Sequence, residues 1–334
     1  MKLIIQIPCY NEAEILDITL GLLPREVPGF DRVEWLVIND GSTDATLAVA
    51  KRFGVDHVVS FKKNQGLAKG FMAGLDACIK NGADVIVNLD ADNQYCVDDI
   101  PALVDPILQG RADLVVGARP IGKIEHFSPL KKFLQKVGSW VVRQASKTDV
   151  PDAPSGFRAF SRDAAMRINV FNKYTYTLET LIQAGRQNMA IIWVPVRVNG
   201  NLRPSRLIKS LRSYLWKSLV TIIRIFVVYL PFRFFMGIGL FLFVPGFLLG
   251  ARFLYYYFGG DGAGHVQSVI LSSVLLGMGF QTMLVAFLAD LLAANRQMVE
   301  DIRFRIKNLE NGGAYSLSAI RRTDEASDRS TASS

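Results

Sequence analysis

Short apolar runs, separated by longer amphipathic stretches, dominate the first 120 residues. The apolar runs predict β-strands at residues 2–7, 33–38, 57–60, 85–89 and 114–117. Between them apolar residues recur every three or four positions, which predicts α-helices, the first with one face made of Ile15, Ile18, Leu22 and Leu23. This alternation predicts an α/β fold, namely a Rossmann-like, mostly parallel sheet with helices on both faces.

The middle of the chain is less regular but continues the alternation. Residues 130–145 and 177–184 predict helices, and residues 191–198 predict a strand. Residues 149–160 form a turn rich in Pro and Gly that leads into another strand. We therefore assign residues 1–200 to a single α/β domain.

The last third of the chain changes to a membrane pattern. Residues 205–226 form an amphipathic helix with Arg and Lys mostly outside its apolar stripe, which predicts a juxtamembrane segment, 201–228, in the headgroup plane. The alternative for this helix is packing on its own domain. Residues 229–294 contain two largely uncharged helices, about 234–257 and 266–290, each long enough to cross a bilayer.

Charge gives this hairpin an orientation. The formal net charge is +8, and Lys and Arg flank the hairpin on both sides but are missing from its turn, residues 259–264. The positive-inside rule then predicts an integral protein of an inner, plasma or ER-type membrane, with the α/β domain and both termini in the cytoplasm. The tail, 295–334, is predicted to be partly disordered. No spacing typical of nucleic-acid binding occurs, and three Cys without a CxxC pair fit a reducing compartment.

The candidate chemistry lies where the predicted strands end. Asp90 and Asp92 follow the fourth strand with one residue between them, so both carboxylates can point to the sheet edge where α/β folds bind ligands. Two close carboxylates repel each other unless a cation separates them, and their hard oxygens suit Mg²⁺ or Mn²⁺. A solvated turn is the alternative for a lone pair of this kind. The other strand ends carry PCYNEAE, NDGSTDAT and NQGLAKG, which would share one crevice.

In their order along the chain, PCYNEAE, NDGSTDAT, NQGLAKGFMAGLDA and DADNQY resemble the family-2 glycosyltransferases of the inverting GT-A fold. PSGFRAF, YTLETLIQA and VPVRVNG, together with the C-terminal hairpin, resemble the polyprenyl-phosphate branch of that family. That branch includes dolichyl-phosphate mannose synthases and undecaprenyl-phosphate sugar transferases. The resemblance implies a cytoplasmic GT-A catalytic domain, a nucleotide sugar donor and a polyprenyl-phosphate acceptor.

The same resemblance implies a donor site. Asp90, Asp92 and Gln94 would hold the Mg²⁺ or Mn²⁺ ion, and Asp40 would hydrogen-bond the base. The full set of donor-binding residues would be Pro8, Tyr10, Asn11, Glu12, Asp40, Gly41, Ser42, Asn64, Gly66, Lys69, Asp90, Ala91 and Asp92. Each alone has a structural alternative, such as a helix cap or a turn. Relatives of this general type favour a UDP-sugar over a GDP-sugar.

The charge of a lipid phosphate sets the requirements of the acceptor site. Its second pKa is about 6, so near neutrality the phosphate is largely dianionic and needs positioning rather than deprotonation. We therefore expect cations without an obligatory general base. The candidates are Arg119, Lys131, Lys132, Arg158, Arg197, Arg203 and Arg206, with Ser205 as a further donor. Arg119 and Arg158 resemble family arginines and join Asp90 and Asp92 as the predicted catalytic residues, while Asp152 is predicted to orient them.

Two departures from the family pattern leave questions open. Relatives often have an acidic residue or His after the metal-motif Gln, where this chain has Tyr95. The segment 197–206 is longer than the family stretch that it resembles, so either Arg203 or Arg206 could meet the phosphate. The alternative functions are transfer to a hydroxyl acceptor, such as a diacylglycerol lipid or a polysaccharide, and a non-catalytic membrane scaffold. Further copies of the same chain, in a homo-oligomer, are a possible additional partner.

Overall fold

The computed structural model describes residues 1–120, 142–143, 146, 148–170, 176–199, 220, 223–260 and 266–311. Most of the predicted helix at 130–145, most of the juxtamembrane helix at 205–226 and the tail beyond residue 311 lie outside the described residues. All statements below concern the described part of the chain.

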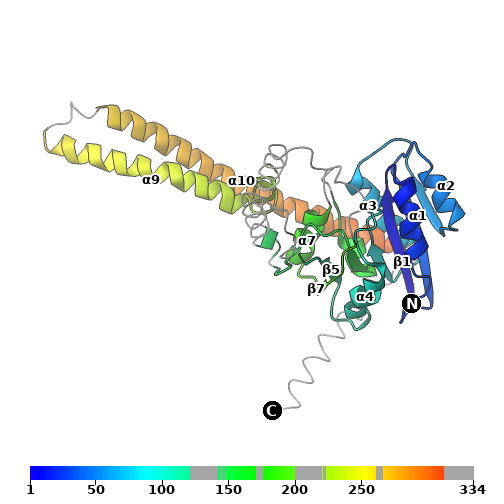
Figure 1. The fold of residues 1–334 in the computed structure, drawn as a ribbon. Coiled ribbons are helices and arrows are strands. Elements are labelled where there is room, and N and C mark those ends of the chain that lie inside the picture. Colours follow the sequence, from blue (N-terminus) through cyan, green and yellow to red (C-terminus); the bar gives the residue numbers. More distant parts are fainter. Residues whose placement is uncertain are drawn as a thin grey trace, which may run out of the picture.

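A seven-stranded sheet forms the centre of the α/β domain (Figure 1). Its strands are β1 (Lys2–Cys9), β2 (Arg32–Asn39), β3 (His57–Ser60), β4 (Val85–Asn88), β5 (Leu114–Ala118), β6 (Arg158–Ser161) and β7 (Ile191–Pro195). They are ordered β3-β2-β1-β4-β6-β5-β7. Every neighbouring pair is parallel except those of β6, which runs antiparallel to both β4 and β5. The predicted α/β fold with a mostly parallel sheet is therefore confirmed.

Helices cover both faces of this sheet, as the apolar strands require. The helices are α1 (Ala13–Leu22), α2 (Thr46–Arg52), α3 (Leu67–Lys80), α4 (Ile100–Leu108), α6 (Arg162–Arg167) and α7 (Thr177–Arg186). In β1, Leu3 and Ile5 face a core shared with α1, α2 and α4, whereas Ile4 faces a core shared with α3, α6 and α7. The apolar residues of β1 thus alternate between two buried layers.

The buried face of α1 differs from the predicted one. Leu16 and Leu20 are fully buried, whereas Ile18 and Leu22 are 45% and 53% exposed. The two candidate stripes are rotated by roughly 100° about the helix axis, and the pattern of apolar residues alone did not separate them. The helix is correctly placed and Leu23 is buried as expected, but Ile18 and Leu22 of the predicted contact face lie on the exposed side.

Two long apolar helices follow the domain and project from it as an antiparallel hairpin (Figure 1). They are α9 (Pro231–Phe258) and α10 (Val266–Glu310), with mean hydropathies of 2.1 and 1.9 in their most apolar windows, and both are candidate membrane spans. Glycines allow close packing between them. A Cβ at Gly246 would lie 2.9 Å from the Cβ of Leu275, and Ser272 donates a hydrogen bond to the Gly246 carbonyl at 2.6 Å.

Helix α10 does not stop at the predicted end of the span near residue 290, but continues as one helix to Glu310. Its last third packs against the α/β domain. Lys307 pairs with Asp76 of α3 at 2.6 Å, Arg303 donates to Asn169, and Phe304 is only 6% exposed. The helix that would cross the membrane is therefore also part of the domain surface.

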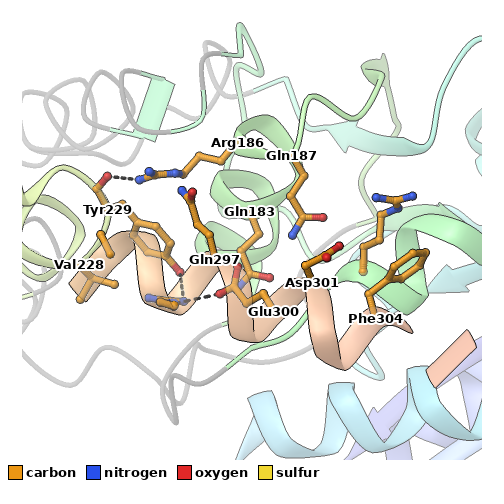
Figure 2. Close-up of a pocket in the computed structure, with 12 residues that line it drawn as sticks. Gln183, Arg186, Gln187, Val228, Tyr229, Gln297, Glu300, Asp301 and Phe304 are labelled. Atoms are coloured by element: carbon orange, nitrogen blue, oxygen red, sulfur yellow. Dashed lines mark hydrogen bonds and ion pairs between the residues drawn. The ribbon is translucent and has the colours of Figure 1, made fainter. Parts of the chain in front are cut away.

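A cavity of about 270 Å³ lies at this junction, between α7, α10 and the segment before α9 (Figure 2). Arg296 of α10 contacts Glu179 of α7 at 3.4 Å and Glu300 at 2.9 Å, and it donates to the Tyr229 hydroxyl at 3.2 Å. Arg186 donates to the Tyr229 carbonyl from the other side. These contacts fix α10 and the start of the hairpin to the α/β domain.

Candidate functional site

The loops that follow β1 and β2 interlock through side chains predicted to bind the donor. The Asn11 backbone N–H donates to Ser42 Oγ at 3.0 Å, and Asn11 Oδ1 accepts from the Thr43 N–H at 2.8 Å. Asn11 has a positive φ of 53°, a conformation that Asn tolerates better than most residues. The two loops therefore form one rigid wall at the C-terminal edge of the sheet.

Asp40 attaches a third loop to this wall. Its two carboxylate oxygens accept hydrogen bonds from the Gln65 and Gly66 N–H groups at 2.6 and 2.9 Å. A Cβ at Gly41, whose φ is +71°, would lie 2.6 Å from the Lys63 carbonyl carbon. The backbone at Gly41 thus lies directly against the loop after β3. Asp40, predicted to bind the base, holds this loop in place.

The other predicted donor-binding residues lie at the same edge. Pro8 lies within β1, Tyr10 just beyond it is 44% exposed, and Glu12 is the N-cap residue of α1. Asn64 is exposed, and Lys69 in the first turn of α3 donates to the Gln65 side chain at 3.1 Å.

Asp90 lies just beyond the end of β4 in a site shaped by Gly156. A Cβ at Gly156 would lie 2.3 Å from Asp90 Oδ2, so only glycine leaves room for this carboxylate. Tyr176 donates to Asp90 Oδ1 at 3.4 Å. Burial and the nearby charge of Asp92 raise the pKa of Asp90 to about 6. Two carboxylates therefore lie close together with too little positive charge beside them.

This pair fits a divalent cation. Among the described residues no three His, Cys, Asp or Glu side chains converge to form a complete metal site. Two carboxylates are, however, the protein ligand set typical of a Mg²⁺ or Mn²⁺ ion whose remaining ligands are substrate phosphates and water. A bound cation would relieve the unfavourable burial of charge that raises the Asp90 pKa.

Arg119, at the end of β5, connects the carboxylates to the predicted acceptor side. It forms a bidentate ion pair with the fully buried Asp152, with distances of 2.7 and 3.0 Å, and donates to Gln94 Oε1 at 3.2 Å. Burial alone would lower the pKa of Arg119, but Asp152 raises it above its ordinary value, so the guanidinium stays charged. Asp152 thus orients Arg119, and Gln94 faces Arg119 while its own N–H donates to Asp92 at 3.1 Å.

Arg158 does not face an acceptor, which corrects the prediction that it binds the lipid phosphate directly. The side chain is completely buried, and its guanidinium donates to the carbonyls of Ala153 and Ser155 at 2.6 and 2.8 Å. A third donor reaches Thr180 Oγ1 at 2.5 Å. Arg158 therefore supports the loop 153–156 from inside the domain, and this loop in turn contacts Asp90 through Gly156.

Tyr95, the departure from the family pattern, is a core residue. It is 1% exposed, its ring lies against Phe157, and its hydroxyl accepts from the Gly156 N–H at 3.1 Å. The backbone at Tyr95 is held by a second contact, since the Asn199 side chain donates to the Tyr95 carbonyl at 3.2 Å. A polar residue larger or smaller than Tyr would break this link between the carboxylate loop and Gly156.

The remaining acceptor candidates are separated from this cluster or lie outside the described residues. Arg197 is 64% exposed and pairs with Asp99 at 2.7 Å, which places it on the outer side of the carboxylate loop. The candidates outside the described residues are Lys131, Lys132, Arg203, Ser205 and Arg206.

Two site residues had no predicted role. Asn88, at the end of β4, donates to the Gly156 carbonyl and the Tyr176 hydroxyl, both at 2.8 Å. Tyr176 stacks on Phe71 with ring centroids 4.1 Å apart and reaches Asp90. An amide inside the apolar run VIVN was a signal for Asn88. Tyr176 lies in the stretch YTLETLIQA, but its partner Asp90 is 86 positions away, and a contact of that range produces no pattern in the neighbouring sequence.

Comparison with known proteins agrees with this geometry. The glycosyl transferase family 2 profile matches residues 4–168. An undecaprenyl-phosphate mannosyltransferase of Micrococcus luteus is 30% identical over 206 residues, covering 59% of this chain and 83% of the relative. A polyprenol monophosphomannose synthase of Mycolicibacterium smegmatis is 27% identical and covers 58% and 76%.

Solved structures support the fold. Glucosyl-3-phosphoglycerate synthase from Mycobacterium tuberculosis, crystallised with Mn²⁺, UDP-glucose and phosphoglyceric acid, superposes with a TM-score of 0.51 at 19% identity. The match covers 66% of this chain and 79% of that one. Since the loops at the strand ends also carry the family's motifs in order, the chain belongs to glycosyl transferase family 2, as a glycosyltransferase of its polyprenyl-phosphate branch.

Proposed function

We propose that this protein transfers a single sugar from a nucleotide sugar to a polyprenyl phosphate, with inversion and with a divalent metal ion, at the cytoplasmic face of the membrane. One observation carries the proposal. The carboxylate pair Asp90 and Asp92 and the cation Arg119 meet at one edge of the sheet, in a domain that is fixed to a candidate membrane hairpin. The names of the relatives supply the lipid phosphate as the acceptor class.

On the donor side, Asp90 and Asp92 would hold Mg²⁺ or Mn²⁺. When bound, the metal would stabilise the negative charge that develops on the departing nucleoside diphosphate. The interlocked loops around Asn11 and Asp40 form the wall against which the nucleotide would lie. We favour a UDP-sugar, because it is the donor named with the structural neighbour that superposes on this fold.

On the acceptor side, Arg119 is the described residue best placed to receive a phosphate. Its ion pair with Asp152 uses one edge of the guanidinium, and the side chain remains 21% exposed. A phosphate dianion beside it is already a nucleophile, so the site needs to orient this group rather than remove a proton. Gln94 contacts Arg119 through its side chain and Asp92 through its N–H, which joins the two halves of the site.

The proposed orientation rests on the distribution of charge. Basic residues flank both ends of the hairpin formed by α9 and α10, and positive-inside placement puts the α/β domain and both termini in the cytoplasm. A C-terminal reporter that is active only outside the cytoplasm would contradict this orientation.

The transfer itself is tested with purified full-length protein in lipid nanodiscs. A panel of labelled UDP- and GDP-sugars is offered with undecaprenyl phosphate, with Mn²⁺, with Mg²⁺ or with a chelator. We expect a lipid-linked sugar only with metal, and a loss of at least 100-fold for Asp92→Asn. The matched control is Asp105→Asn, an exposed carboxylate on α4, which should keep full activity.

Each outcome of this experiment is informative. Full transfer by Asp92→Asn, or transfer in the presence of chelator, would remove the metal from the proposal. A product formed only on a diacylglycerol or another hydroxyl lipid would replace the phosphate acceptor. No turnover of any nucleotide sugar, with the protein folded, would favour a scaffold.

A further inference from the structure

Helix α10 carries an apolar stripe beyond the part that would cross the membrane. Val299, Ile302, Ile306 and Leu309 are 61%, 55%, 49% and 77% exposed. Their spacing of three, four and three residues is the a/d pattern of a heptad repeat. Continued toward the N-terminus, the same register passes through Asn295 and reaches three more exposed apolar residues, Leu292, Leu288 and Val285.

A lipid environment accounts for only the first part of this stripe. Seven of the fifteen residues 296–310 are charged, so this segment cannot lie in the hydrocarbon region. Exposed apolar side chains in a row, on a helix surrounded by water, mark a surface that another protein surface covers. We call Val299, Ile302, Ile306 and Leu309 the α10 stripe.

The opposite face of α10 packs on the α/β domain, and this packing leaves the α10 stripe exposed. Phe304 is buried and lies beside the pocket at α7 (Figure 2). Lys307 pairs with Asp76, and Arg296 pairs with Glu179. In the part of α10 that would cross the membrane, the face opposite to the stripe packs on α9. Ala286, which lies on this face, is fully buried. The helix therefore cannot rotate to bury the stripe without losing these contacts.

The surroundings of the stripe leave room for a second helix. A cavity of about 450 Å³ runs beside Val299, Ile302 and Ile306, and its opposite wall is formed by Ile79 and Lys80 at the end of α3. Side chains of a partner helix could fill this groove while the helix backbone lies along the stripe.

We propose that the α10 stripe is the contact surface for a second copy of this chain, joined through a parallel coiled coil of the two α10 helices. Two copies inserted in the same membrane have the same orientation, so their α10 helices are parallel by construction. A two-fold axis along the membrane normal then places each stripe against itself, as a symmetric dimer requires. Asn295, the polar residue in a core position, is of the kind that fixes register in such coils.

The charges beside the stripe are complementary in this arrangement. In a parallel coil the g position of one helix meets the e position five residues later in the other. Here Arg305, which pairs with Asp301 of its own helix at 2.9 Å, occupies a g position, and Glu310 occupies the matching e position. In the proposed coil Arg305 would therefore also lie beside Glu310 of the second copy, on both sides of the axis. Both side chains lie on the exposed part of α10. Apolar pattern, orientation and charge therefore all favour the same partner.

Cysteine cross-linking in native membranes tests the parallel register. Ile302→Cys places a thiol next to its counterpart on the axis, whereas Asn308→Cys on the same helix places it to the side. We expect at least fivefold more disulfide-linked dimer for Ile302→Cys than for Asn308→Cys. Both variants carry Cys96→Ser, because Cys96 is partly exposed whereas Cys9 and Cys78 are buried, and Cys96→Ser alone should give only background. Equal yields at the two positions would overturn the proposal.

The mass of the particle in nanodiscs or mild detergent gives an independent test. We expect twice the 37.1 kDa chain for the unaltered protein and one chain for Ile302→Glu combined with Ile306→Glu. Arg305→Glu should weaken the dimer at least tenfold, and adding Glu310→Arg should restore it. Because all four positions are exposed, retained helix content by circular dichroism is expected and controls for folding.

Three results would contradict this surface assignment. One is a monomeric unaltered protein, and another is a dimer that survives Ile302→Glu with Ile306→Glu. The third is a dimer that appears only after residues 312–334 are removed, which would make the chain's own tail the cover of the stripe.

Discussion

The narrow space between Gly156 and Asp90 makes Gly156→Ala the most direct test of the site. The new methyl group would lie 2.3 Å from Asp90 Oδ2, whereas ordinary van der Waals contact begins at 3.4 Å. The backbone at Gly156 cannot retreat easily, since its N–H donates to Tyr95 and its carbonyl accepts from Asn88. The carboxylate must therefore move by roughly 1 Å, the difference between the two distances.

The size of the effect follows from this displacement. A misplacement of about 1 Å in a reacting constellation costs about 100-fold in rate, which is about 2.7 kcal/mol of transition-state stabilisation. Overpacking of a rigid site also lowers the free energy of unfolding by about 1–3 kcal/mol. Gly156→Ala should therefore lose about 100-fold in transfer rate and weaken Mn²⁺ binding, while the protein still folds.

The assay compares the rate of sugar transfer and the Mn²⁺ affinity in the presence of UDP. The matched control is Gly21→Ala, since a Cβ there meets only Phe53 at an ordinary 3.8 Å on an exposed part of α1. It should keep its rate and gain slightly in stability, because Ala is the better helix former. A Gly156→Ala protein within threefold of the unaltered rate would refute the idea that Gly156 positions Asp90.

Three further substitutions test other contacts of the domain. Asp152→Asn leaves Arg119 without its buried partner, so we expect a loss of about 3 kcal/mol in unfolding free energy and at least tenfold in rate; unchanged values for both would argue against an orienting role. Tyr176→Phe should weaken Mn²⁺ binding about tenfold, about 1.4 kcal/mol, as Asp90 loses its donor, and calorimetry showing equal affinity would contradict this. Burial alone would raise the pKa of Glu34, but its bonds to neighbouring cations lower it. Its stabilisation is therefore present above its unfolded pKa of about 4.3 and lost as the pH falls through the folded value, so Glu34→Gln should flatten the acid limb of Tm against pH.

Much of the fold could be predicted because its signals are local. The strands are apolar runs that end in polar loops, and the carboxyl ends of parallel strands share one edge, so Asp40, Asp90 and Arg119 were expected to meet there. The local pattern of apolar residues does not show in which direction a strand runs in the sheet, or which face of a helix is buried. Strand β6 is antiparallel although the chain before it alternates regularly, and α1 buries Leu16 where Ile18 was expected.

At the site, too, the sequence did not show which way side chains point or which distant residues they contact. Arg158 matched a motif arginine, but the motif does not reveal whether a guanidinium faces the solvent or the interior, and here it supports a loop from below. Tyr95 was visible as a departure, yet its role depends on Gly156, which lies 61 residues away. Contacts between residues so far apart in the chain are determined by tertiary packing, and they produce no periodic pattern in the sequence.

The continuity of α10 has a consequence for the geometry of the reaction. At 1.5 Å per residue, its 45 residues form a rod of about 67 Å. With the hairpin inserted in a membrane, as we propose, this rod would fix both the height and the rotation of the α/β domain above the bilayer. One residue inserted near Asn295 would lift the domain by only about 1.5 Å but turn it by about 100°. Seven inserted residues would nearly restore the rotation and lift it by about 10 Å. One insertion changes mainly the orientation of the domain toward a membrane-bound acceptor, and the other changes mainly its distance from that acceptor. Comparing the two variants therefore shows which of these quantities, both set by the length of α10, limits transfer.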